Sequence, residues 1–114
     1  MADKTLFEKI IDGEIPSTML HEDDRCVAFA DVNPQAPVHI LIVPRKPLPG
    51  IEDMTATDES LVGHLFTVAN SVAKDQDLGK GYRLVINNGE HGQQSVPHLH
   101  LHLIGGRQLS WPPG

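Results

Sequence analysis

Three histidines alternate with leucines in the segment SVPHLHLHLIGG, which spans residues 95–106. His98, His100 and His102 occupy every second position. On a β-strand, successive side chains point to opposite faces, so the three imidazoles would share one face and the leucines the other. We expect the leucine face to pack against a helix. The histidine face allows three interpretations: a metal site, a catalytic site or a solvated polar strand face.

A zinc site is the first interpretation, because histidines at positions i and i+2 of a strand can ligate one ion. A rise of ~3.3 Å per residue puts the first and third histidines roughly 13 Å apart along a regular strand. That separation is too large for one ion, since Zn–N bonds are only ~2.0–2.1 Å long. A zinc site would therefore take two of the histidines together with His39 or a carboxylate, and it would leave one histidine without a role.

Nucleophilic catalysis uses all three histidines. Neutral imidazole is a competent nucleophile near neutral pH because its reference pKa is ~6.5. It can attack phosphorus to form a covalent intermediate that water then cleaves, while neighbouring histidines donate to phosphoryl oxygens or to the leaving group. The preceding loop NGEHGQQS has glycines that allow backbone amides to cradle a phosphate, and Ser95 offers a hydroxyl.

The surrounding sequence predicts an α+β domain. Residues 5–13 predict a short helix, with Thr5 and Glu8 at capping-box spacing and Gly13 at its end. A second helix is expected over about residues 57–75, where apolar side chains recur at helical spacing. Strands are expected over residues 17–22, 26–32, 38–44, 81–87 and 98–104. This order predicts a mostly antiparallel sheet with both helices on one face.

Composition argues against several classes of partner. The 114 residues carry a formal net charge of −6, which disfavours binding to nucleic acids or to anionic membranes. Aromatic residues make up 4%, too few for a platform on which single strands stack. With no signal-like leader and no apolar run near ~20 residues, we expect a cytoplasmic protein. We interpret Cys26 as a buried small hydrophobe, and His21, His64 and His91 as surface residues.

The chain resembles the histidine-triad (HIT) family, and within it the Hint branch of histidine-triad nucleotide-binding proteins. HLHLHLI fits the His–x–His–x–His motif, and the segments FEKIIDGEIP, DVNPQAPVHILIVP, GYRLVINNG and GGRQLSWPPG are similar to this branch in the same order. The resemblance covers essentially the whole chain and implies one HIT domain over residues 1–114. It implies a HIT-like α+β fold, in which a five-stranded antiparallel sheet with two helices continues across a homodimer interface.

The resemblance also implies an activity, that of a purine nucleoside phosphoramidase. Such an enzyme cleaves the P–N bond of adenosine or guanosine 5′-phosphoramidates through a nucleotidyl-histidine and releases AMP or GMP, with neither metal nor cofactor. The implied partners are a purine nucleotide and a second copy of the chain, with no nucleic acid and no membrane. The alternatives are a dinucleoside polyphosphate hydrolase, a zinc-dependent hydrolase or zinc-binding module, and a regulatory nucleotide-binding protein with little turnover.

By position, the resemblance assigns separate roles to the polar residues. His100 would be the nucleophile, His98 would orient it, and His102 would contact the phosphate. His39 would join the relay, and Ser95 would donate to the leaving group or to a phosphate oxygen. The implied nucleotide-binding residues are a ribose-binding acid and its neighbour, polar contacts near the phosphate, an apolar base pocket and a C-terminal tryptophan: Asp31, Val32, Asn87, Gln93, Gln94, Phe7, Ile10, Phe29, Leu41 and Trp111.

Several of these residues have an equally simple structural interpretation. The apolar members can be plain core, His39 can be a core histidine with its hydrogen bonds satisfied, and Asp31 can be a turn residue before NPQAP. Two positions also depart from the family pattern. Gln93 stands where a second loop glycine is usual, so a left-handed backbone there would be strained. Pro97 stands where an aromatic residue is common, and it lacks a backbone donor, so we expect it at a strand start or edge.

Overall fold

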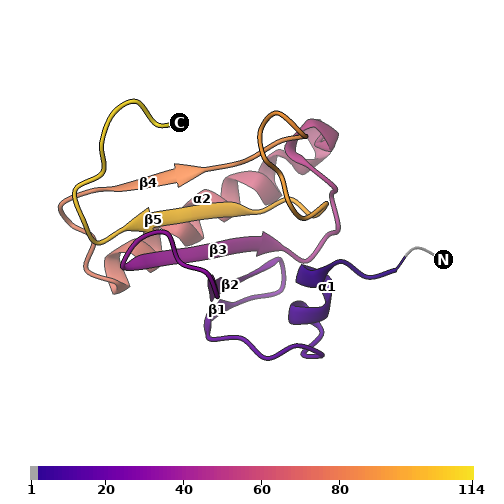
Figure 1. Cartoon of the computed structure of the whole chain (residues 1–114). Coiled ribbons are helices and arrows are strands. Elements are labelled where there is room, and N and C mark those ends of the chain that lie inside the picture. The colour runs from indigo at the N-terminus through magenta and orange to yellow at the C-terminus, as the bar shows by residue number, and fades with distance from the viewer. Residues whose placement is uncertain (1–2) are drawn as a thin grey trace.

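The computed structural model describes residues 3–114, which form two α-helices and a five-stranded antiparallel sheet in the order β1-β2-β3-β5-β4 (Figure 1). The helices are α1 (Leu6–Ile11) and α2 (Glu59–Asp75), and two short 3₁₀ turns, η1 (Ile51–Asp53) and η2 (Ala56–Asp58), precede α2. The strands are β1 (Met19–Glu22), β2 (Cys26–Ala30), β3 (Val38–Pro44), β4 (Tyr82–Val85) and β5 (Leu101–Gly105). The predicted α+β class and the five-stranded antiparallel sheet are confirmed.

Helix α1 is short, and its start is fixed by side chains. The hydroxyl oxygen of Thr5 accepts from the Glu8 amide at 3.2 Å, and the Glu8 carboxylate accepts from the Thr5 amide at 3.0 Å. This reciprocal pair is the predicted capping box, and it satisfies two amides that have no partner inside the helix. Gly13 follows the helix with φ +79°, a conformation that favours glycine.

The two helices cover opposite faces of the sheet, so the expectation of one shared face is wrong. Phe7 of α1 packs in a cluster with Phe29 and Leu41, whereas α2 packs over the alternate residues of the same strands. The residues of α2 and of the sheet in that second cluster include Leu65, Val68, Ala28, Ile40, Ile42, Leu101 and Leu103. Strands β2 and β3 are therefore buried on both faces, as their nearly continuous apolar runs require.

Strand β5 begins at Leu101, three residues later than expected. Pro97 has no amide to donate to a neighbouring strand. The His98 amide instead donates to the carbonyl of Val96 at 2.8 Å, and the Leu99 amide donates to the carbonyl of Leu48 at 2.7 Å. His98 and His100 therefore precede the regular strand. The leucine face packs over α2 as predicted, because Leu99, Leu101 and Leu103 belong to the cluster under that helix.

The remaining boundaries differ from the predicted ones by a few residues. Helix α2 begins at Glu59 because residues 56–58 form the tighter η2 turn, in which Thr55 and Asp58 make a second capping box. Strand β4 is confined to Tyr82–Val85, shorter than the predicted 81–87. Within residues 3–114, neither helix has the length and apolar character needed to cross a bilayer.

Candidate active site

A cleft of about 240 Å³ opens on the α1 face of the sheet. Its floor comes from β2, β3 and β5, and its walls come from α1 and from the chain that enters β5. The structure brings together here most of the residues predicted for the site, namely Phe7, Ile10, Phe29, Asp31, Val32, Leu41, Ser95, His100 and His102. The lining is mainly apolar with a few polar groups at one end, which is typical of a small-molecule site.

His100 is the most buried polar group that lines this cleft, with 4% of its surface exposed. Its Nδ1 lies 2.7 Å from the carbonyl oxygen of His98, so Nδ1 carries the proton and donates it. The lone pair of the neutral ring is consequently on Nε2. Burial lowers the pKa of His100, which keeps the ring unprotonated. The ring of Phe7 meets it edge to face, with the centroids 4.8 Å apart. The arrangement therefore holds a neutral imidazole with a free Nε2.

His98 lies behind His100 and is fully buried. Its Nε2 donates to the carbonyl oxygen of Pro44 at 2.8 Å, and its Nδ1 accepts from the hydroxyl of Thr5 at 3.3 Å. Both ring nitrogens are thus occupied by the fold, and the carbonyl of the same residue is the acceptor for His100. His98 is not among the residues that line the cleft, and it acts on the site through its backbone.

His102 and His39 form a second linked pair. The backbone amide of Gln35 donates to Nδ1 of His39 at 3.0 Å, which leaves the proton of this ring on Nε2. That proton is donated to Nδ1 of His102 at 2.9 Å, so His102 carries its own proton on Nε2. Burial, His100 and His39 together lower the pKa of His102 to about 4. Its ring centroid is 4.9 Å from that of His100. His102 is therefore a neutral N–H donor next to the neutral imidazole of His100.

Asp31 links the relay to the rim of the cleft. One carboxylate oxygen accepts from the Asn33 amide at 2.8 Å in a tight turn, and the other lies 3.4 Å from Nε2 of His39. Asp31 is therefore both a turn residue and a lining residue of the cleft. Val32, next to it, is 93% exposed and lies at the mouth of the cleft.

Asp31, His39 and His102 also offer three ligand atoms within 4.8 Å of one another. They fit a metal ion poorly, because Nε2 of His39 would have to lose its proton. The neutral ring would then carry a proton on Nδ1, directed at the backbone amide of Gln35, which is a second donor. The Gln35 amide is part of the backbone and cannot rotate away from the ring of His39 as a side chain could. The positions of these three residues therefore suit the hydrogen-bonded relay better than a metal ion.

Four predicted binding residues do not line the cleft of this chain. Gln94 holds the loop before β5 in place: its side chain accepts from the Gly89 amide at 3.0 Å and donates to the carbonyl of Pro49 at 2.7 Å. Asn87 donates to the carbonyl of Gly92 at 2.7 Å. Gln93 has φ +61°, the left-handed conformation that makes glutamine strained here.

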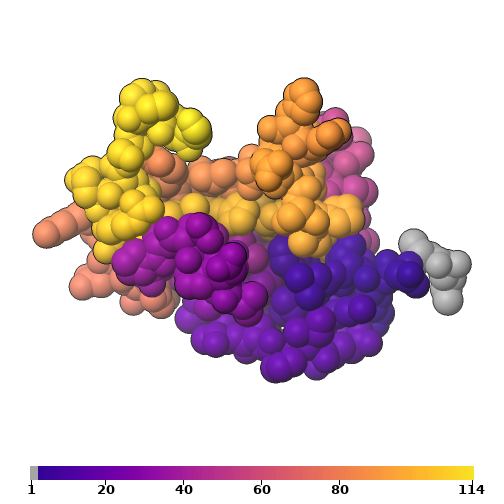
Figure 2. Space-filling view, viewed as in Figure 1, coloured from indigo at the N-terminus to yellow at the C-terminus, as the bar shows by residue number. Residues whose placement is uncertain are grey.

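The fourth is Trp111, which is 83% exposed. It belongs to the C-terminal segment, which projects from the body of the molecule on the same side as the loop that follows β4 (Figure 2). In Figure 2 a hollow separates these two projections.

Sequence reasoning missed two groups that shape the site. The capping-box spacing predicts Thr5 as a helix cap, but its hydroxyl also reaches His98 across 93 positions of sequence. The backbone amide of Gln35 fixes the tautomer of His39, and the turn residues in DVNPQ are the only sequence signal for that contact.

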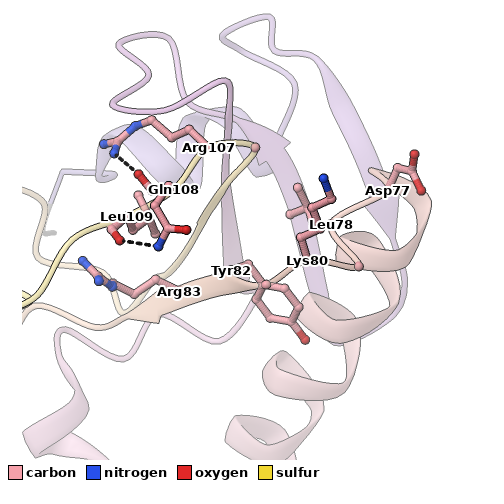
Figure 3. A pocket seen from close by; sticks show the side chains of 11 residues that line it. Asp77, Leu78, Lys80, Tyr82, Arg83, Arg107, Gln108 and Leu109 are labelled. Carbon is pink, nitrogen blue, oxygen red and sulfur yellow. Dashed lines mark hydrogen bonds between the residues drawn. The ribbon is translucent and has the colours of Figure 1, made fainter.

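A larger cavity of about 800 Å³ lies beside the start of β4 and the segment that follows β5 (Figure 3). It is lined by residues 77–83 and 106–109, none of which was predicted for the site. Among its side chains, Arg83 donates to the carbonyl of Ser110 at 2.8 Å and Arg107 to that of Gln35 at 3.2 Å. Both arginines are engaged in hydrogen bonds that hold the C-terminal segment in place. The groups suited to nucleophilic catalysis, His100 and His102, line the smaller cleft instead.

Several known proteins are similar to this chain in sequence and in fold. The HIT domain family matches residues 12–109. An uncharacterized HIT-like protein of Synechocystis sp. is 56% identical over the full 114 residues of both chains. The crystal structure of a HIT family hydrolase from Legionella pneumophila is similar with a TM-score of 0.95 and 46% identity, covering 97% of this chain and 100% of that one. A histidine triad nucleotide-binding protein from Candida albicans is similar with a TM-score of 0.82 and 29% identity, covering 97% and 85% respectively.

Proposed function

Because the chain belongs to the HIT domain family, we propose that it is a purine nucleoside phosphoramidase whose nucleophile is His100. The observation that carries the proposal is the hydrogen bond from Nδ1 of His100 to the carbonyl of His98, which leaves the Nε2 lone pair free. Burial keeps the ring neutral, so the lone pair is available at neutral pH.

The reaction follows from these proton positions. Nε2 of His100 attacks phosphorus, the P–N bond breaks, and the departing amine takes a proton from a donor in the cleft. Ser95, which also lines the cleft, and Nε2–H of His102 are the available donors. A water molecule then attacks the nucleotidyl-histidine and returns a proton to that donor. The bond from phosphorus to Nε2 breaks, and the nucleoside monophosphate leaves.

The rest of the cleft suits a nucleoside. The aromatic and aliphatic side chains of Phe7, Ile10, Phe29 and Leu41 offer an apolar surface for a flat base. The carboxylate of Asp31 at the rim offers a charged acceptor for ribose hydroxyls. The similar protein from Candida albicans is a nucleotide-binding protein, which supports the same ligand class here.

Turnover of an adenosine 5′-phosphoramidate by wild type and by His100→Asn tests the proposal. We expect acid quenching to trap a nucleotidyl adduct on His100 of the wild type, and we expect the variant to lose several orders of magnitude in kcat. His91→Asn is the matched control, because His91 is an exposed loop histidine outside the cleft. Full turnover by His100→Asn would overturn the assignment.

The leaving group separates the proposed activity from its main alternative. A dinucleoside polyphosphate hydrolase would use the same nucleophile but expel a nucleotide instead of an amine. Comparing kcat/KM for the phosphoramidate with kcat/KM for a diadenosine polyphosphate decides between them, and we expect the phosphoramidate to be preferred.

We also propose that the chain is a homodimer whose sheet continues across the interface. Strand β4 is the last strand of the sheet and pairs with β5 on one side, so its other edge is available to a second copy. The exposed indole of Trp111 is an apolar group that such an interface would cover. Sedimentation equilibrium should give twice the chain mass of 12.5 kDa, and a mass of one chain at micromolar concentration would refute the dimer.

A further inference from the structure

A second cluster of histidine, carboxylate and thiol groups lies away from the cleft, where the β1–β2 hairpin meets α2. Nε2 of His21 is 2.8 Å from Oδ2 of Asp23, and Nε2 of His64 is 2.6 Å from the same oxygen. Sγ of Cys26 is 3.6 Å from it. The side chains of His21 and His64 are 32% and 18% exposed, so these predicted surface residues reach solvent but are partly covered by the cluster.

An irregularity in β1 directs His21 towards this cluster. Met19 pairs with Phe29 on the α1 face, and two residues later His21 would ordinarily share that face. The register shifts between them, so His21 pairs with Ala28, which faces α2. β-Bulges re-aim side chains in this way and recur next to functional sites. The bulge thus places an imidazole beside the carboxylate and the thiol.

The Asp23 carboxylate is held in a fixed orientation. Its Oδ1 accepts from the amides of Arg25 at 2.7 Å and Cys26 at 2.8 Å, and its backbone carbonyl accepts from Nε of Arg45 at 2.8 Å. Oδ2 is left to face the imidazoles and the thiol. Outer hydrogen bonds of this kind orient the ligands of metal sites and raise their affinity.

We propose that His21, Asp23 and Cys26 bind a divalent cation of the zinc class, with His64 as the fourth ligand. Possible ligand atoms of the first three residues already lie within 4.8 Å of one another. A tetrahedral zinc ion with bonds of ~2.0–2.3 Å needs ligand atoms roughly 3.3–3.6 Å apart, so small adjustments bring these three into place. His64, whose Nε2 lies 2.6 Å from Oδ2 of Asp23 but which is outside that group of three, must shift further to complete the tetrahedron. Thiolate, imidazole and carboxylate are the ligands that zinc prefers.

The protons in the cluster must be displaced for the ion to enter. Burial is the main reason that the pKa of Cys26 is raised to about 12, so the free thiol is protonated and the ion must compete for the sulfur. Nδ1 of His64 lies 3.0 Å from a guanidinium nitrogen of Arg25, which must move away for His64 to ligate through Nε2. Unlike the backbone amide that faces His39, Arg25 is an exposed side chain and is free to turn.

The ion would join the β1–β2 hairpin to the first half of α2, on the side of the sheet opposite the histidine cleft. The site would therefore stabilise the fold, and it does not depend on the proposed catalytic activity. The acidic turn supports cation binding, since the three carboxylates of Glu22, Asp23 and Asp24 outnumber the two nearby guanidinium groups of Arg25 and Arg45.

Cobalt(II) is the sharpest probe, because Cys26 is the only cysteine of the chain and the histidine cleft contains none. A near-ultraviolet charge-transfer band from thiolate to cobalt therefore reports this site alone. We expect wild type to show that band at one cobalt per chain, together with the visible bands of tetrahedral coordination, and zinc to displace the cobalt.

Two variants separate ligation from folding. Cys26→Ser should abolish the band, and His21→Ala, a change at a half-exposed position, should weaken zinc binding by at least the roughly 10–100-fold that loss of an outer-shell partner costs. Zinc should raise the Tm of wild type and of the exposed-loop control His91→Ala, but not that of His21→Ala. Absence of the thiolate band in wild type, or equal zinc binding by His21→Ala and His91→Ala, would overturn the proposal.

Discussion

The hydroxyl of Thr5 at the start of α1 lies 3.3 Å from Nδ1 of His98, the histidine whose carbonyl accepts the proton of His100. The same hydroxyl oxygen accepts from the Glu8 amide and caps the helix. One side chain therefore fixes the helix and the histidine that precedes the proposed nucleophile His100. The N-terminal helix is in this way part of the scaffold of the site.

Replacing Thr5 tests this link. Thr5→Val removes both contacts, so we expect a loss of about 1 kcal/mol in unfolding free energy from the cap and a fall of about tenfold in kcat from the displaced His98, equivalent to ~1.4 kcal/mol. Thr5→Ser keeps the hydroxyl and should restore both quantities. Chemical denaturation and steady-state kinetics measure them. A purely structural role would lower stability and leave kcat of the folded enzyme unchanged.

Asp31→Asn should impair binding of the ribose. A hydrogen bond to a charged group contributes ~1.5–3 kcal/mol, so kcat/KM should fall roughly 10–150-fold, mainly through KM. The asparagine oxygen can still accept from the Asn33 amide, so stability should change little. A 2′-deoxy substrate gives the control, because wild type should discriminate against it more strongly than the variant does. Equal discrimination by both proteins would contradict a ribose contact.

The loop before β5 should respond oppositely to two neighbouring changes. A Cβ on Gly92 would clash with the carbonyl oxygen of Asn88, so Gly92→Ala must shift backbone and should cost about 1–3 kcal/mol of unfolding free energy, with loss of activity. Gln93→Gly relieves a left-handed φ of +61° and should stabilise the protein by up to ~1 kcal/mol. Urea denaturation measures both. Destabilisation by Gln93→Gly would show that the glutamine side chain supports the loop.

The pKa values of His100 and His102 predict how stability depends on pH. Both are lowered in the folded protein, that of His102 to about 4 from an ordinary value of 6.5. Between pH 6.5 and 4 the unfolded chain therefore binds more protons, and the unfolding free energy should fall as the pH drops through this window. Tm measured across the window checks this. His102→Asn should flatten the dependence, and an unchanged slope would argue against the lowered pKa.

The catalytic activity should also fall at acid pH. Protonation of His100 removes the lone pair that attacks phosphorus, so kcat/KM should be level at neutral pH and decline only below pH 6.5, because the pKa of His100 is lowered. A decline that begins above pH 6.5 would show that His100 titrates at or above its ordinary pKa in the free enzyme.

Much of the fold could be predicted from local patterns. The Thr5–Glu8 capping box, the apolar spacing of α2 and the β-branched run 38–44 are signals of single elements, and each gave an element of the right type. The side of the sheet on which α1 packs is a tertiary property. The nearly continuous apolar runs of β2 and β3 are the available sequence signal, because a strand covered on one face only would alternate apolar and polar residues.

The site was harder to predict in detail. The alternation of histidine and leucine predicts a regular strand over residues 98–104, whereas Pro97 delays the start of β5 to Leu101, so His98 and His100 precede the strand. The proximity of Thr5 to His98 and of His64 to Asp23 depends on long-range packing, which spacing in one sequence does not encode. The residues of β1, MLHE, likewise contain no sequence signal for the bulge that turns His21 towards α2.

The chain has a single tryptophan, Trp111, and its indole is almost fully in water. The intrinsic fluorescence of the isolated subunit is therefore already that of a solvated indole. Denaturation of a monomer should hardly shift its emission, so circular dichroism is the better reporter of unfolding. A blue shift of the emission with rising protein concentration would instead record the burial of the C-terminal segment, which makes this residue a built-in optical sensor of self-association.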